Sequence, residues 1–197
     1  MPPDILGASE MPENGKNRPH QMREGACYLV KEGKPLLSFK LFEMMLTDGA
    51  NGLCITRQYP ERLKENYKIE KAKTIWLSQT PSDGGHNPTS IGPLATVVAR
   101  YVEENRESAL ILDGVEYLVV NNGFPQVLKF IEHVNEIIMR SNSIMIIPVS
   151  PDAFDRKEMA LLERNLEVIE SPLVSFGKPV AKPAAKNEDV GELLDKY

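Results

Sequence analysis

The chain has 197 residues, of which 42% are hydrophobic and 26% charged, and its formal net charge at pH 7 is -5. These values are typical of a soluble protein with one sizeable core, and the acidic balance argues against a protein that coats nucleic acid, because that task needs a basic face. No apolar run approaches the roughly 20 residues that span a bilayer, and the N-terminus lacks the pattern of a secretory signal, so we expect a cytoplasmic protein without a membrane segment.

Composition divides the chain into four parts. Residues 1–24 are rich in Pro, Glu, Asn and Gly without a hydrophobic period, which predicts a disordered tail. Residues 25–170 alternate short apolar runs with longer amphipathic ones, the pattern of an α/β domain. Residues 171–186 combine Pro, Ala and Lys and predict an extended linker, and residues 187–197 predict a short amphipathic helix.

Short apolar runs in the domain predict strands. They lie at residues 27–30, 52–57, 74–78, 109–113, 144–149 and 166–170. The first five are nearly continuous in apolar residues rather than alternating, which indicates that helices cover both faces of the sheet. The sequence therefore predicts a three-layer α/β sandwich with a mainly parallel sheet of five to six strands. In such folds ligands bind at the carboxyl ends of the strands.

Amphipathic segments between these runs predict helices. They lie at residues 35–49, 60–67, 90–105, 124–142 and 150–165. Pro35 suits a first helical turn and Gly49 suits a C-terminal cap. In the last segment, Asp155 followed by Glu158 has the form of a capping box, although that helix can equally begin at Ser150.

The loop after the first strand bears on whether the domain hydrolyses nucleotides. A P-loop enzyme needs the motif GxxxxGK[ST], whose amides and lysine hold phosphates, and an apolar strand that ends in an acid. The run ALILD, which ends in Asp113, has the form of that strand. The loop reads KEGKPLLS, so the motif is absent, and Pro35 has no amide hydrogen to donate. We therefore expect a P-loop-like scaffold without a P-loop, although Lys31 and Lys34 can still attract an anion.

Several polar residues follow predicted strands and can share one rim of the sheet. The candidates for ligand binding are Arg57, Ser78, Asp113, Glu116 and Asp152. A planar guanidinium at Arg57 suits phosphate or carboxylate, and a salt bridge with a rim acid is the simpler interpretation. Asp113 can cap the turn at Gly114, or it can join Glu116 and Asp152 in a three-carboxylate site for a hard cation.

No catalytic arrangement is evident in the sequence. Cys27 and Cys54 lie in apolar runs, where a thiol behaves as a small buried hydrophobe, and they form no CxxC pair. Of the three histidines only His86 can lie near the rim, in a loop that we expect to be mobile and solvated. A GxSxG turn is absent as well. We therefore predict no catalytic residues, no metal site and no cofactor.

The segment 187–197 carries an apolar stripe at helical spacing. Its members are Val190, Leu193, Leu194 and Tyr197. Because the segment is too short to be helical alone, we expect it to fold in a groove, either on a protein partner or on the domain itself.

Motifs that occur in order along residues 26–170 resemble a known family. They are YLV, DGANGLCITRQYPERLKENY, TIWLS, SIGPLATVVARYV, ALILDGVEYLVVNNGFPQVLKFIEHVN and IMIIPVSPDAFDRKEMALLER. Together they resemble the archaeal family known as domain of unknown function 835. The resemblance implies a degenerate relative of the RecA and circadian-clock-type ATPases, found alone or fused to sensory and histidine-kinase modules. No catalytic residues are established for that family, so the resemblance assigns none.

Two functional hypotheses follow. The first is a non-catalytic regulatory or protein-interaction module in archaeal signalling, which binds a protein partner through the segment 187–197. The alternative is a nucleotide-binding or nucleotide-hydrolysing protein with an unconventional phosphate site around Arg57, Asp113 and Glu116. A subunit of a larger assembly is a third possibility.

Overall fold

The computed structural model describes residues 22–80 and 85–170. The predicted linker at 171–186, the predicted helix at 187–197 and nearly all of the predicted N-terminal tail lie outside the described residues.

The described residues form one parallel sheet. Its strands are β1 (Ala26–Lys31), β2 (Asn51–Thr56), β3 (Lys73–Leu77), β4 (Gly85–His86), β5 (Ser108–Asp113), β6 (Ile144–Val149) and β7 (Glu167–Glu170). Their order across the sheet is β4-β3-β2-β5-β6-β1-β7, and every pair of neighbouring strands is parallel. The predicted α/β fold is confirmed, with seven strands in place of the expected five to six.

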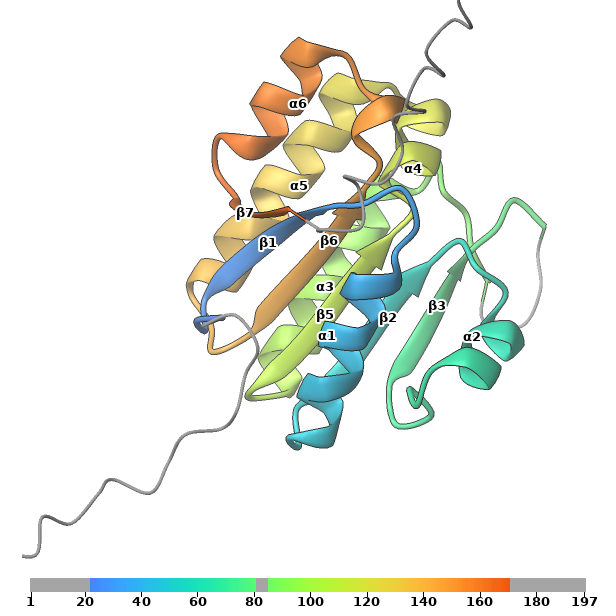
Figure 1. Ribbon diagram of the computed structural model, residues 1–197, viewed down its shortest axis with the longest axis vertical. Coiled ribbons are helices and arrows are strands. Elements are labelled where there is room, and N and C mark those ends of the chain that lie inside the picture. Colours follow the sequence, from blue (N-terminus) through green and yellow to red (C-terminus); the bar gives the residue numbers. More distant parts are fainter. Residues whose placement is uncertain (1–21, 81–84, 171–197) are drawn as a thin grey trace, which may run out of the picture.

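Helices connect the strands and cover both faces of the sheet. They are α1 (Leu36–Thr47), α2 (Pro60–Asn66), α3 (Ile91–Glu104), α4 (Val115–Asn122), α5 (Phe124–Met139), α6 (Arg156–Glu163) and the short 3₁₀ helix η1 (Pro151–Ala153). One core cluster joins the sheet to α1 and α2, and the other joins it to α3, α4, α5 and α6 (Figure 1). Both faces are therefore covered at the centre of the sheet, which explains why β1, β2, β5 and β6 are almost entirely apolar and buried.

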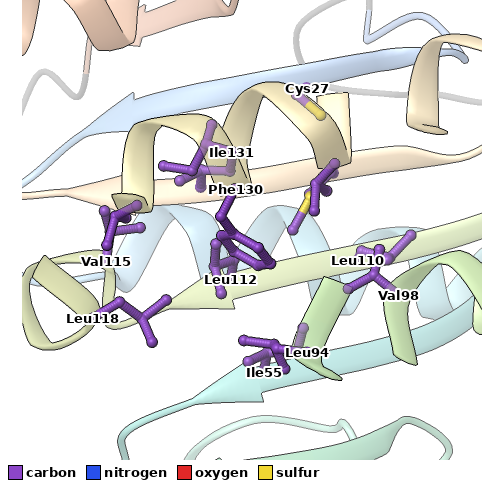
Figure 2. Packing of buried hydrophobic residues seen from close by; sticks show 14 of the residues in the cluster. Cys27, Ile55, Leu94, Val98, Leu110, Leu112, Val115, Leu118, Phe130 and Ile131 are labelled. Carbon is purple, nitrogen blue, oxygen red and sulfur yellow. The ribbon is translucent and has the colours of Figure 1, made fainter. Parts of the chain in front are cut away.

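The larger core cluster lies between the sheet and the α3–α5 layer. Figure 2 shows its buried side chains, among them Leu94 and Val98 of α3, Phe130 and Ile131 of α5, and Ile55, Leu110 and Leu112 of the strands. Phe130 is 5% exposed and the strand residues are fully buried. This dense packing holds the carboxyl ends of β2, β5 and β6 in fixed positions for the loops that follow them.

Two elements, α4 and β4, were not predicted. In GVEYLVVNN the β-branched residues favour a strand, but Gly114 has φ +114°, which ends β5 and starts α4. β4 is two residues long, too short for a periodic pattern, and it exists because Gly85 and His86 pair with Trp76 and Leu77. The loop around His86, which we expected to be mobile and solvated, thus contains a short strand, in which Gly85 is exposed and His86 half-buried.

The start of α6 settles an alternative that the sequence left open. The side chain of Asp155 accepts a hydrogen bond from the Glu158 amide at 2.7 Å, and Glu158 Oε2 accepts one from the Asp155 amide at 3.1 Å. This is the predicted capping box. Ser150 instead precedes the separate helix η1. In the described part of the chain, no helix has the length and apolar character needed to cross a membrane.

Candidate functional site

A pocket of about 860 Å³ opens at the carboxyl edge of the sheet, where the parallel strands end. Its walls are the β1–α1 loop, the residues after β2 and β5, the start of α4, the end of α2 and the end of β6. These segments meet because β5 and β6 lie between β1 and β2, so the loops after β1 and β2 face each other across two strand ends. Open α/β sheets bind their ligands at such places.

The carboxylate of Glu32 occupies the first turn of α1. The residue is 5% exposed. Its Oε2 accepts a hydrogen bond from the Leu37 amide at 2.9 Å, and its Oε1 accepts one from the Ser38 amide at 2.9 Å and another from the Ser38 hydroxyl. The first amides of a helix have no partner within the helix, and the helix dipole favours a negative charge there. Glu32 therefore supplies an internal anion at the place where a P-loop protein holds phosphate.

The triphosphate of a nucleotide does not fit this loop in the P-loop manner. The amides of Leu37 and Ser38 are already bonded to Glu32, and Pro35 has no amide hydrogen. A phosphate at the same helix end would also lie against the buried carboxylate, and two adjacent negative charges with little solvent between them repel strongly. The amides of Leu37 and Ser38 are therefore not free to donate to a phosphate in this structure.

The two lysines near the loop have different surroundings. Lys31 Nζ lies 3.0 Å from a carboxylate oxygen of Glu163 and 3.2 Å from one of Glu170. The hydrogen bonds with Glu163 and Glu170 raise the pKa of Lys31. The expectation that Lys31 can attract an anion is therefore wrong. Lys34 lines the pocket, is exposed and forms no ion pair with any residue that the structure describes.

Asp113 ends β5 at the floor of the pocket and is held by residues of the neighbouring strand. Its Oδ2 accepts hydrogen bonds from the Thr56 hydroxyl at 2.7 Å and from the Gln58 side-chain amide at 3.0 Å. Burial raises the pKa of Asp113, and these two hydrogen bonds oppose that rise. The side chain does not cap α4, so the predicted turn cap at Gly114 is wrong.

Arg57 follows β2 and lies over an aromatic ring. Its guanidinium carbon is 4.1 Å from the centroid of the Tyr117 ring. This is a cation–π contact with the third residue of α4. The simpler expectation, a salt bridge with a rim acid, is wrong within the described ranges, where Arg57 forms no ion pair. A Cβ on Gly114 would lie 3.3 Å from Arg57 Cβ, so the glycine permits this close approach.

Glu116 joins two walls of the pocket. Its Oε1 accepts a hydrogen bond from the Ser150 amide at 2.7 Å, which ties the first turn of α4 to the residue after β6. The side chain is half-buried and lines the pocket. The helix dipole favours acidic residues in the first turn of a helix, so the carboxylate of Glu116 also stabilises the start of α4.

The structure brings Arg57, Asp113 and Glu116 together and leaves the other two candidates outside the pocket. Ser78 follows β3, where its amide donates to the His86 carbonyl at 3.0 Å and its hydroxyl accepts from the Thr80 amide at 3.1 Å. Asp152 is exposed in η1. Across residues 22–80 and 85–170, no group of three or more His, Cys, Asp and Glu side chains is arranged to hold a metal ion.

Sequence reasoning missed three residues of the pocket wall. Glu32 was considered only as part of a loop that lacks the P-loop motif, and its position four residues before α1 is not a usual N-cap position. Tyr117 was missed because α4 was not predicted. Tyr67 stacks on Phe39 with ring centroids 4.8 Å apart, and burial raises the pKa of its hydroxyl.

Solved structures of low sequence identity share this fold. A protein from Pyrococcus horikoshii studied in a structural project is 16% identical, with a TM-score of 0.55, and the match covers 76% of this chain and 83% of that one. The flagellar accessory protein FlaH from Methanocaldococcus jannaschii is 15% identical, with a TM-score of 0.56 and coverage of 76% and 72%. A KaiC-like protein from Pyrococcus horikoshii is 13% identical, with a TM-score of 0.54 and coverage of 75% and 73%. The fold is therefore RecA-like, as the resemblance implied.

Comparison of the sequence with known families gives one match. None of the curated proteins matches the chain significantly. A family model described as "Protein of unknown function (DUF835)" matches residues 33–166. The matched range covers α1 to α6 and includes Arg57, Asp113 and Glu116, but it begins one residue after Glu32.

Proposed function

The chain belongs to the DUF835 family of proteins of unknown function, and we propose that it is a non-catalytic regulatory or protein-interaction module, in cytoplasmic signalling, on a RecA-like scaffold that no longer binds phosphate at α1. One observation carries this proposal: the buried carboxylate of Glu32 occupies the amides at the start of α1.

The energetics of that carboxylate support the loss of phosphate binding. A phosphate that entered the first turn of α1 would have to displace Glu32 from three hydrogen bonds. Leaving a buried polar group without a partner costs about 1–3 kcal/mol, and more for a charged group. Intramolecular capping also involves no loss of translational freedom, whereas phosphate binding does. The internal anion therefore outcompetes an external one.

Apolar side chains at the mouth of the pocket support a protein partner. Leu36 lines the pocket and is 46% exposed, and Val120 on α4 is 84% exposed. Val120 lies three residues after Tyr117 and four after Glu116, so helical spacing places it on the same face of α4 as those two pocket residues. Exposed apolar groups next to a polar pocket are typical of surfaces that bind other proteins.

The C-terminal stripe remains part of this proposal. Val190, Leu193, Leu194 and Tyr197 lie outside the described residues, and we propose that they dock on the partner as one face of a short helix. Pull-down of the full chain from its native source, followed by the same experiment on a chain that lacks residues 187–197, tests this role. A partner retained at unchanged affinity by the shortened chain would contradict it.

Calorimetry tests the absence of nucleotide chemistry. The full chain is titrated with ATP, GTP and cyclic dinucleotides, with and without Mg²⁺, and phosphate release is measured over the same conditions. We expect neither binding heat nor hydrolysis. Binding of any of these nucleotides that vanished in Arg57→Ala would contradict the proposal.

The alternative function is favoured by one specific observation. Arg57 and Lys34 both line the pocket and form no ion pairs in the part of the chain that the structure describes, so their charges remain available to an anion. A nucleotide whose phosphates lay beside Arg57 rather than at α1 would fit the alternative of an unconventional phosphate site. Loss of binding in Arg57→Ala, with binding retained in Lys40→Ala on the exposed side of α1, would identify that site.

A further inference from the structure

The chain leaves the described domain beside the pocket. β7 pairs with β1 in parallel, with Lys31 opposite Glu170. Lys31 Nζ lies 3.2 Å from a carboxylate oxygen of Glu170, so the last described residue is held against the end of β1. Glu32, the first residue after β1, lines the pocket. Residue 171 therefore starts one strand away from the pocket wall.

The segment that follows is long enough to cross the pocket. β7 is separated from β5 by β1 and β6, which makes three spacings between adjacent strands. At about 4.8 Å per spacing this is roughly 14 Å, and an extended chain covers about 3.3–3.6 Å per residue. About five residues after Glu170 thus suffice to come level with Asp113 at the end of β5. Residues 176–178 can reach the pocket floor without movement of the domain.

The chemistry of the segment complements the pocket. Residues 171–186 read SPLVSFGKPVAKPAAK and contain three lysines, at 178, 182 and 186, and no Asp or Glu. The pocket is lined by three carboxylates, Glu32, Asp113 and Glu116, against two cations, Lys34 and Arg57. Asp113 Oδ1 and Glu116 Oε2 form no hydrogen bond within residues 22–80 and 85–170, so each can accept one from an ammonium group.

The segment also carries apolar side chains that can pack on the apolar part of the pocket wall. Leu173, Val174 and Phe176 precede the first lysine. The pocket offers Leu36, which is 46% exposed, and the rings of Tyr67 and Tyr117. An aromatic side chain that packs on a tyrosine ring while the next lysine pairs with a carboxylate would bury both kinds of group together.

From these observations we propose that residues 171–186 fold back over the carboxyl edge of the sheet and occupy this pocket in the same molecule, with Phe176 against the tyrosine rings and Lys178 beside Asp113 and Glu116. The occupant is an apolar and basic peptide segment, attached at Glu170. This proposal is independent of the proposed function, because a nucleotide-binding protein could cover its pocket in the same way.

Paramagnetic relaxation in the full chain tests the position of the segment. Ser175→Cys places a spin label next to Phe176. Labelling is selective because Cys27 and Cys54 are buried, and burial raises the pKa of both thiols, that of Cys27 to about 12. We expect the amide signals of Gly33 and Gly114, at the pocket, to lose most of their intensity, while Gly49 at the opposite edge of the sheet keeps its intensity.

Charge reversal in the segment gives a matched comparison. In the labelled chain, Lys178→Glu combined with Lys182→Glu is expected to restore the Gly33 and Gly114 signals. The control combines Lys129→Glu on α5 with Lys157→Glu on α6, two exposed lysines, and changes the net charge equally. The control is expected to leave the broadening unchanged.

Three outcomes would overturn the proposal. The first is full intensity at Gly33 and Gly114 in the labelled chain, and the second is equal broadening at Gly49. The third is broadening in a mixture of isotope-labelled chain without spin label and unlabelled chain with spin label, which would place the segment of a second copy in the pocket. None of these results depends on nucleotide binding, so failure here is separable from failure of the proposed function.

Discussion

Glu32 Oε1 lies 2.9 Å from the amide nitrogen of Ser38, six residues along the chain, and the same oxygen accepts the Ser38 hydroxyl. This relationship makes Glu32 an internal cap for the first turn of α1. The carboxylate satisfies amides that otherwise need a ligand, so the domain has no structural requirement for phosphate at this position. Substitution of Glu32 therefore tests directly how much this cap contributes to the stability of the domain.

Substitution of Glu32 by Gln should destabilise the domain by about 1–3 kcal/mol, because the neutral amide has one acceptor oxygen for groups that the carboxylate satisfies with two. Urea denaturation followed by circular dichroism measures the difference. Glu103→Gln on the exposed side of α3 is the control, and its effect should stay within about 0.5 kcal/mol. Equal stability of the two variants would show that Glu32 is not a cap.

The charge of Asp113 should make stability depend on pH. Burial raises the pKa of Asp113 above its ordinary value of 3.8, so the folded state binds this proton more readily than the unfolded state does. The resulting stabilisation is complete below the ordinary value and is lost as pH rises through the raised pKa. Asp113→Asn cannot titrate.

The measurement for Asp113 is the free energy of unfolding of both chains at a series of pH values. The stability of Asp113→Asn relative to the native chain should rise as pH increases from below 3.8 to neutrality. Glu132→Gln, an exposed residue in the middle of α5, serves as the control and should show no comparable trend. A difference that stayed constant with pH for Asp113→Asn would contradict the role of burial.

The contact between Arg57 and Tyr117 should appear in a double-mutant cycle. An exposed cation–π contact contributes about 0.5–1 kcal/mol, so Arg57→Ala and Tyr117→Leu should show a coupling of that size. Tyr101, whose hydroxyl donates to the Gly52 carbonyl at the other end of β2, provides the control. Arg57→Ala and Tyr101→Leu should be additive within about 0.3–0.5 kcal/mol. Additivity of Arg57→Ala and Tyr117→Leu would show that the contact contributes no measurable coupling energy.

Two glycine substitutions should act in opposite directions. Gly114 has φ +114°, and a Cβ there would lie 3.3 Å from Arg57 Cβ, so Gly114→Ala should cost at least about 1 kcal/mol. Gly92 lies in the first turn of α3 with nothing within 4 Å of an added Cβ. Gly92→Ala should therefore stabilise the domain by about 0.4–1 kcal/mol. Thermal denaturation of both variants checks the signs.

The strands other than β4 were predictable because each lies in a short run rich in apolar residues and bounded by polar or turn residues. The run at 109–113 and the observed β5 (Ser108–Asp113) differ by one residue. α4 was not predictable in the same way, since its β-branched residues favour a strand and the left-handed conformation of Gly114 is what redirects the chain. A local pattern cannot reveal that backbone conformation when the flanking residues all suit a strand.

The candidate site was predictable only in part. Arg57, Asp113 and Glu116 follow β2 and β5, which are adjacent strands, and they meet in one pocket. Ser78 follows β3, one strand further out, and lies outside it. Strand order therefore separates residues that chain order makes equivalent, because β3 lies on the side of β2 away from β5 and the pocket.

By itself, the amino-acid sequence determined the layered α/β fold and the absence of the motif GxxxxGK[ST], because hydrophobic periodicity and the residues of the β1–α1 loop are local properties of the chain. Only the tertiary structure decided that Glu32 caps α1, that Arg57 lies over Tyr117, and that the chain leaves β7 beside the pocket. Each of these relationships depends on loop geometry or on strand order, which are set by the packing of segments that are distant in the sequence.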